Sequence, residues 1–165
     1  MKGIIFDLDL TLVDSTIAEE ARSRRDWPRV YSLIPQFRLY PGIESVFEYI
    51  RSNRNRVAVA IVSTAPSSYV GRVVNHFNIP VDTIVGYHDA QRKPSPAGMF
   101  MAMQRMGVSP SETISFGDRA IDIQASNAAG IKSVACLWGG KENALLLNSR
   151  PDRVISAPVD IIDCL

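Results

Sequence analysis

The chain has 165 residues, enough to bury the core of one domain, and we expect a single domain over residues 1–165. Its 46% hydrophobic and 21% charged residues exclude a disordered chain, and its 18 basic and 17 acidic residues nearly cancel, which argues against nucleic acid or a membrane surface as a partner. Two cysteines with no usable spacing and the lack of a signal-peptide core lead us to expect a cytoplasmic protein.

Apolar runs of strand length alternate along the chain with segments that have the period of amphipathic helices. The predicted strands are residues 3–9, 56–64, 81–87, 112–118, 132–138 and 152–156. The predicted helices are residues 43–52, 68–77, 96–106 and 121–129. Gly107 and Gly130 follow the last two helices, where a helix-ending glycine is common. This alternation predicts an α/β fold built on a parallel sheet.

Residues 15–40 depart from the alternation. They combine a helical start with several arginines, followed by prolines and scattered aromatic residues. We expect a short insertion after the first strand. Its arginines at 22, 24, 25 and 29 could contact an anionic substrate, but a solvated helix face is the favoured interpretation of such a run.

Acidic and hydroxyl side chains stand where three of the predicted strands end. Asp7 and Asp9 close the first strand, Ser63 and Thr64 close the second, and Asp118 closes the fourth. Because the carboxyl ends of parallel strands meet at one edge of the sheet, where ligands bind in open α/β folds, we expect these side chains to converge. Converging carboxylates need a cation, and Mg²⁺ takes oxygen ligands and often a substrate phosphate as well.

This convergence indicates phosphoryl transfer. Asp7 could attack phosphorus and form an aspartyl-phosphate, which divides one difficult displacement into two steps. Asp9, pointing the same way from the same strand, could protonate the departing alcohol and later deprotonate the attacking water. Ser63 and Lys93, which precedes a proline in QRKPSP, could meet the charge of the transferring group.

Each of these residues also has a structural interpretation. The first two aspartates could form a solvated strand end, the two hydroxyls could cap a helix, and Lys93 could be an ordinary exposed lysine. Asp118 and Asp122 could be helix-start carboxylates favoured by the helix dipole, while Asp14 is interpreted as the cap of the segment after it. The occurrence of all the chemical groups together favours a site.

Four motifs, taken together and in order, resemble the haloacid dehalogenase superfamily of phosphotransferases: DLDLT (7–11), IVST (61–64), RKPSP (92–96) and FGDRAIDIQASNAAG (116–130). LWGG (137–140) and PDRVISAPVDII (151–162) also resemble the C-terminal end of that family. The resemblance implies a three-layer, Rossmann-like parallel sheet with a short helical cap in residues 15–40. It also implies a Mg²⁺-dependent phosphatase whose partner is a small phosphorylated metabolite.

The resemblance further implies a role for each matching residue. Asp7 would be the nucleophile, Asp9 the general acid/base and Lys93 the group that balances their charge. The implied metal ligands are Asp7, the backbone carbonyl of Asp9, Asp118 and, in support, Asp122. The implied phosphate-binding groups are Ser63, Lys93 and the backbone amides of Leu8 and Thr64, with Thr11 orienting the first loop.

Two features depart from the family pattern. Leu10 stands where the family usually has glycine, so its side chain must fit near the entrance of the site, which affects substrate shape. The insertion is shorter than a full cap, so the cleft would be more open, admitting a bulky substrate or being completed by a neighbouring subunit of a homo-oligomer. The alternatives to a phosphatase are a phosphomutase, a phosphonatase-like enzyme and a non-catalytic phosphoryl-binding module.

Overall fold

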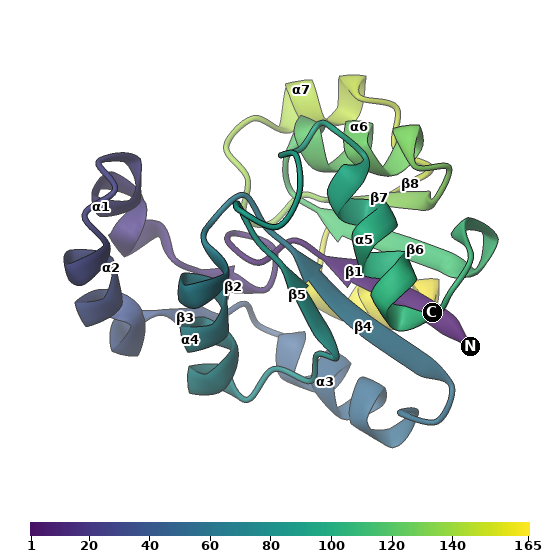
Figure 1. The fold of residues 1–165 in the computed structure, drawn as a ribbon, viewed down its shortest axis with the longest axis horizontal. Helices are drawn as coiled ribbons and strands as arrows, with labels where there is room; N and C mark the ends of the chain where they lie inside the picture. Colours follow the sequence, from purple (N-terminus) through teal and green to yellow (C-terminus); the bar gives the residue numbers. More distant parts are fainter.

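A computed structural model, which describes residues 1–165, contains a six-stranded parallel sheet with the strand order β5-β4-β1-β6-β7-β8 (Figure 1). The strands are β1 (Lys2–Phe6), β4 (Val57–Val62), β5 (Thr83–Val85), β6 (Thr113–Gly117), β7 (Lys132–Cys136) and β8 (Arg153–Ile155). Every neighbouring pair in this sheet is parallel. The predicted α/β fold is confirmed.

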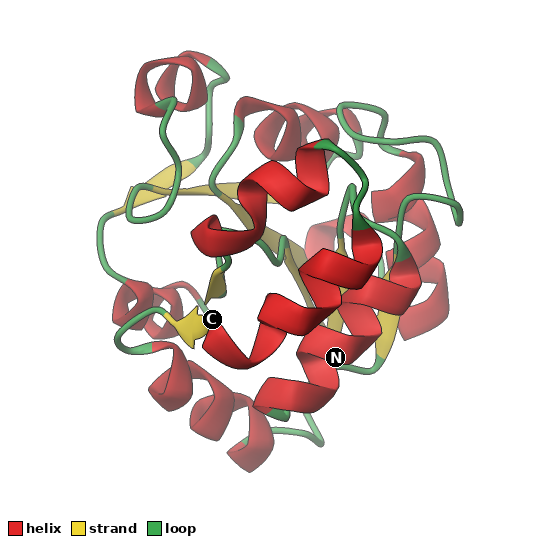
Figure 2. Ribbon diagram, turned by 90° about the vertical axis from the view of Figure 1, so that its left-hand side faces the viewer, coloured by secondary structure: helices red, strands yellow, loops and turns green.

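Helices cover both faces of the sheet and make a three-layer architecture (Figure 2). One face is packed by α3 (Ile43–Ser52), α4 (Ser67–Phe77) and the 3₁₀ helix η4 (Pro158–Cys164). The other is packed by α5 (Ala97–Met106) and α6 (Ala120–Ala128), with α7 (Asn143–Asn148) beside α6. Ile4 and Ile5 of β1 belong to opposite cores because neighbouring strand residues face opposite sides.

Several predicted strands end earlier than the sequence pattern indicated. β1 stops at Phe6 instead of residue 9, because the chain then turns so that the backbone amides of Leu12 and Val13 donate to the carbonyl of Leu8. β6 begins and ends one residue inside its predicted range, and β7 ends at Cys136 instead of residue 138. All the predicted site residues except Asp122, which is on a helix, therefore stand on loops beyond the strands.

The predicted insertion forms a small helical unit beside the sheet, at the left of Figure 1. Its elements are η1 (Thr16–Ala18), α1 (Glu19–Ser23), α2 (Trp27–Leu33) and η2 (Ile34–Gln36). The carboxylate of Asp14 accepts hydrogen bonds from the backbone and the hydroxyl of Thr16, as expected for a cap. A two-stranded antiparallel ribbon, β2 (Val13–Asp14) with β3 (Arg38–Leu39), closes the unit and was not predicted from the sequence.

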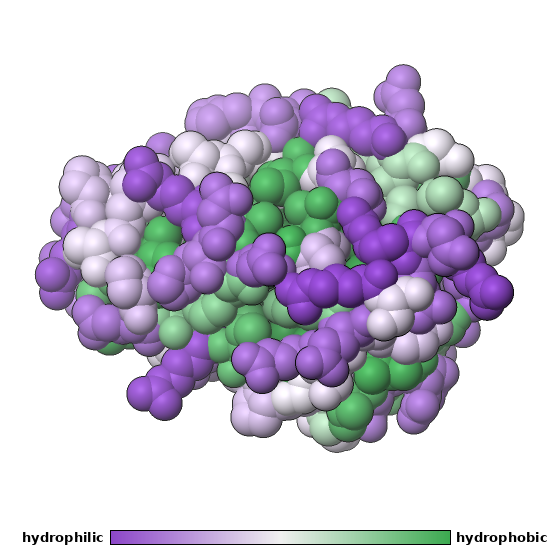
Figure 3. Space-filling view, turned by 90° about the horizontal axis from the view of Figure 1, so that it is seen from below, coloured by the Kyte–Doolittle hydropathy of each residue, from purple (hydrophilic) through white to green (hydrophobic).

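The insertion is packed against the rest of the protein through α4. The rings of Trp27 and Tyr69 lie 5.8 Å apart between centroids, and Val30 and Leu33 of α2 join the larger core. Hydrophilic side chains surround hydrophobic areas on the face shown in Figure 3. None of the helices is both long and apolar enough to cross a lipid bilayer.

Candidate active site

The predicted site residues gather at the carboxyl edge of the sheet, around an open cleft of about 1030 Å³. Those that line it are Asp7, Asp9, Ser63, Thr64, Lys93 and Asp118. Asp122 lies buried behind this surface, on the first turn of α6, and Leu8 is fully buried in the core. Three strand ends and the loop before α5 thus supply one site, as the topology of a parallel sheet predicts.

Three carboxylates lie together at and just beneath the surface of the cleft, and we call Asp7, Asp118 and Asp122 the floor carboxylates. One oxygen from each can be chosen so that all three lie within 4.8 Å of one another. Asp118 and Asp122 are almost completely buried, with exposed fractions of 1% and 3%. So many acidic groups in a small, largely dehydrated volume repel one another unless cations accompany them.

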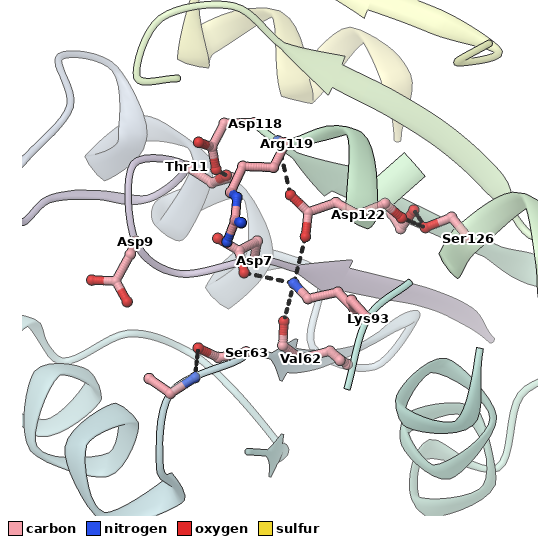
Figure 4. A network of polar contacts seen from close by, with 12 residues as sticks. Asp7, Asp9, Thr11, Val62, Ser63, Lys93, Asp118, Arg119, Asp122 and Ser126 are labelled. Atoms are coloured by element: carbon pink, nitrogen blue, oxygen red, sulfur yellow. Dashed lines mark hydrogen bonds and ion pairs between the residues drawn. The ribbon is translucent and has the colours of Figure 1, made fainter. Parts of the chain in front are cut away.

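Lys93 supplies one of these cations. Its ammonium group donates to Asp7 Oδ1 at 2.7 Å, to Asp122 Oδ1 at 2.5 Å and to the carbonyl of Val62 at 2.9 Å (Figure 4). Burial alone would lower the pKa of Lys93, but the charges of Asp122 and Asp7 outweigh burial and raise the pKa above its ordinary value. Lys93 is therefore a charged, fully hydrogen-bonded lysine, and the interpretation as an ordinary exposed side chain is wrong.

Asp118 is the least satisfied of the floor carboxylates. Its Oδ1 accepts a hydrogen bond of 2.8 Å from the hydroxyl of Thr11, but its Oδ2 is buried without a hydrogen-bond partner. Burial, together with the charges of Asp7 and Asp122, raises the pKa of Asp118 to about 8. For Asp7, burial is opposed by Lys93 and the pKa is raised to about 6. An unpartnered carboxylate oxygen beside two further carboxylates fits the oxygen ligands that a hard divalent cation requires.

Asp122 is held in this group by the close approach of α6 to β6. A methyl group at Gly117 would lie 2.3 Å from the Asp122 Cβ atom, so only glycine permits this approach. The backbone amide of Arg119 donates to Asp122 Oδ2 at 2.9 Å, while the other carboxylate oxygen accepts from Lys93. The Arg119 side chain lines the cleft together with Asp7 (Figure 4), a placement that the sequence pattern did not reveal.

Asp9 does not join the floor carboxylates, and the prediction that its side chain points the same way as Asp7 is wrong. Its Oδ1 accepts from the hydroxyls of Ser15 at 2.5 Å and Tyr69 at 2.6 Å, and its Oδ2 pairs with Arg22 at 2.7 Å. Figure 4 shows the carboxylate turned away from Asp7. The two-residue alternation of a strand cannot relate the two aspartates, because β1 ends before either of them.

Arg22 is also placed differently from the prediction. Its side chain is only 18% exposed and pairs with Asp9, so the solvated interpretation is wrong for this residue. Arg24 does fit that interpretation, because its side chain is 74% exposed and pairs only with Glu20 on the same helix. The partners of Asp9 come from the insertion and from α4. No local spacing links segments so far apart in the sequence, which is why these contacts were missed.

Ser63 and Thr64 follow β4 and stand on the wall of the cleft. The Ser63 hydroxyl oxygen accepts from the backbone amide of Ala65 at 3.1 Å, which leaves its O–H group free to donate to a ligand. Ser63 is almost fully buried, whereas Thr64 is partly exposed. The pair can therefore present donors to an oxyanion in the cleft, as phosphoryl binding requires.

Leu10 adopts a left-handed backbone conformation with a φ of 66°, which residues other than glycine rarely adopt. This conformation explains why glycine suits the position. The turn at Gly139 packs directly against it, because a methyl group on Gly139 would lie 1.9 Å from the Leu10 carbonyl oxygen. Trp138 also donates from its indole to the Thr11 carbonyl at 2.9 Å, so the turn after β7 fixes the loop that carries Asp7 and Asp9.

Replacing Gly139 with alanine is expected to destabilise the protein by about 2 kcal/mol, because the new methyl group must displace the Leu10 backbone. Urea unfolding followed by circular dichroism measures the loss. The matched control is Gly71→Ala on α4, where no atom lies within 4 Å of the added methyl and no loss of stability is expected. Equal stabilities of the two variants would contradict the close contact.

Replacing Asp118 with asparagine is expected to stabilise the protein at pH 8 to 9 in EDTA, by on the order of a few kcal/mol. The pKa of Asp118 is about 8 in the folded protein against an ordinary value of 3.8, so the folded state binds this proton more tightly. The free energy of unfolding of the wild type should therefore fall as pH rises from the ordinary pKa of 3.8 to the folded-state pKa of about 8, and the fall should be smaller in Asp118→Asn. Urea unfolding at several pH values tests this, and parallel curves for both proteins would contradict it.

Comparison with known proteins gives a family match and several relatives. The family described as haloacid dehalogenase-like hydrolase matches residues 21–136. A phosphoglycolate phosphatase of Pseudomonas syringae pv. tomato is 28% identical over 158 residues, covering 93% of this chain and 57% of the relative. Pyrophosphatase PpaX of Oceanobacillus iheyensis is 31% identical over 126 residues, covering 74% of this chain and 58% of the relative. The chain thus spans about half the length of these relatives.

Solved structures share the same fold. A haloacid dehalogenase-like family hydrolase from Streptococcus pneumoniae has a TM-score of 0.80 and 22% identity, with 99% of this chain and 98% of that chain covered. A hydrolase from Pseudomonas syringae has a TM-score of 0.79 and 19% identity, with 99% and 97% covered.

Proposed function

Because the chain belongs to the haloacid dehalogenase-like hydrolase family, we propose that it is a Mg²⁺-dependent phosphatase that hydrolyses a phosphate monoester through an aspartyl-phosphate. The observation that carries the proposal is the contact of Lys93 with both Asp7 and Asp122, beside the unpartnered oxygen of Asp118. This arrangement pairs a nucleophile with a fixed positive charge and leaves acceptors for a metal. The family also supports the proposal, since two relatives are named as phosphatases of small phosphorylated compounds.

In the first step, a carboxylate oxygen of Asp7 attacks phosphorus and the bond between phosphorus and the leaving oxygen breaks. Lys93 holds Oδ1 of Asp7, which leaves the second oxygen to act as the nucleophile. Ser63 and the nearby backbone amides bind the oxygens of the transferring group. A Mg²⁺ ion held by Asp7 and Asp118, with support from Asp122, would neutralise part of the phosphoryl charge.

Asp9 would give a proton to the departing alcohol and later take one from the water that hydrolyses the aspartyl-phosphate. Its carboxylate lines the same cleft but is bound to Arg22 and Tyr69. The proposed role therefore requires the Asp9 side chain to turn from these partners toward Asp7 while the substrate is bound.

The test is release of inorganic phosphate from a broad panel of phosphorylated metabolites, with 2-phosphoglycolate and pyrophosphate included because of the relatives' names. Multiple turnovers are expected with Mg²⁺ and none in EDTA. No release from any compound would overturn the proposal. Binding of substrate with at most one turnover would instead support a non-catalytic phosphoryl-binding module.

A further inference from the structure

The positively charged side chains around the cleft divide into two groups. Three have carboxylate partners: Arg22 with Asp9, Lys93 with two floor carboxylates, and Lys141 with Glu19 at 2.6 Å. Three others have no carboxylate within 4.0 Å, namely Arg25, Arg92 and Arg119. The charges of the second group are therefore available to a ligand.

Arg25 and Arg92, which we call the rim arginines, converge on one aromatic ring. Their guanidinium carbons lie 6.0 Å and 4.9 Å from the centroid of the Tyr87 ring, which also lines the cleft. A cation–π contact at an exposed position is weak and leaves the guanidinium N–H groups free to donate. Both guanidinium groups therefore lie beside Tyr87, which does not neutralise their charges.

Each rim arginine lies close in the sequence to a residue that contacts one of the two proposed catalytic aspartates. Arg25 follows α1, three residues after Arg22, whose side chain is fixed on Asp9. Arg92 immediately precedes Lys93, whose ammonium contacts Asp7. One rim arginine thus comes from the insertion and the other from the loop before α5, and both face the cleft that contains the nucleophile.

The charge at the floor does not require the rim arginines. Lys93 and one divalent cation would balance the three floor carboxylates, and Arg119, which lines the same cleft as Asp7, is available to the transferring phosphoryl group. Two guanidinium groups remain at the rim, where a leaving group must lie. Arginine N–H groups form strong charge-assisted hydrogen bonds with carboxylate and phosphate oxygens.

We propose that Arg25 and Arg92 bind a second anionic group on the leaving-group side of the substrate. This inference rests on the proposed function and narrows its substrate class to phosphate compounds whose leaving group carries a carboxylate or a further phosphate. The rim arginines are then the specificity-determining residues, because a neutral leaving group could not form the charge-assisted hydrogen bonds with their guanidinium groups.

The experiment compares kcat/KM for matched substrates that carry or lack the second anionic group. The carboxylate arm uses 2-phosphoglycolate against 2-phosphoglycolamide, and the phosphate arm uses ethylene glycol bisphosphate against 2-hydroxyethyl phosphate. The wild type should prefer the charged member of at least one pair, and that arm identifies the anion. Arg25→Gln and Arg92→Gln should each reduce the preference about tenfold, and Arg→Lys at either position should restore part of it.

Arg24→Gln is the matched control, because Arg24 lies next to Arg25 but does not line the cleft. The ratio of kcat/KM for the charged and neutral members of each pair should be the same in this variant as in the wild type. Equilibrium binding of each pair to the Asp7→Asn protein gives a readout that does not depend on turnover. The inference is overturned if the wild type turns over both members of each pair equally, or if the glutamine variants leave the ratio unchanged. Absence of turnover with every substrate would instead overturn the proposed function.

Discussion

Asparagine in place of Asp7 is expected to lower kcat by at least about a thousandfold while the protein stays folded. The amide oxygen of asparagine is a poor nucleophile toward phosphorus, so no aspartyl-phosphate can form at this position. The substitution also removes a carboxyl group, largely buried, whose pKa is raised to about 6, chiefly by burial. The folded state should therefore lose little stability. Phosphate release with Mg²⁺ and a thermal unfolding curve measure the two effects separately.

Asp9→Asn is the informative companion to this variant, because its side chain has the same size and lies in the same loop. If Asp9 acts in proton transfer, the loss should be about a hundredfold to ten-thousandfold, and it should be smaller for substrates with acidic leaving groups. The Asp7→Asn protein should show no such dependence on the leaving group. Full turnover by Asp7→Asn would show that Asp7 is not the nucleophile.

Replacement of Lys93 with methionine is expected to destabilise the protein by about 3 kcal/mol or more, in addition to abolishing turnover. Methionine has a similar length but no charge. It would leave Asp7 and Asp122 as neighbouring, largely buried carboxylates without the ammonium group that now contacts both. Urea unfolding in EDTA measures the loss, which added Mg²⁺ should reduce because a cation can take over part of the same charge balance.

The double variant Lys93→Met with Asp122→Asn decides whether this loss comes from unpaired charge. Removing Asp122 together with its partner should recover a measurable part of the stability, since fewer buried carboxylates are then left without a cation. Additive losses in the two single variants and the double variant would show that Lys93 contributes through packing alone. Asn is suited to the test because it can keep the hydrogen bond from the Arg119 amide.

The sequence alone was sufficient for the parallel sheet and for the meeting of Asp7, Ser63 and Asp118. Hydrophobic periodicity is local, and the topology of a parallel sheet brings all carboxyl ends of its strands to one edge. α3 occurs at the predicted residues 43–52 for the same reason, because every apolar position of its buried face lies within ten residues of the others. Motif order then indicated the family that the comparison confirmed.

The tertiary structure alone decided where the Asp9 carboxylate points and what Arg22 and the rim arginines contact. Asp9 meets Tyr69 across sixty residues of sequence, and Arg25 meets Tyr87 from a separate structural unit. Such contacts depend on how helices and loops are oriented after the core has packed, and a sequence period carries no information about that orientation. Charge type and strand position are local properties of the chain, whereas the partner of each charge is set by the folded arrangement.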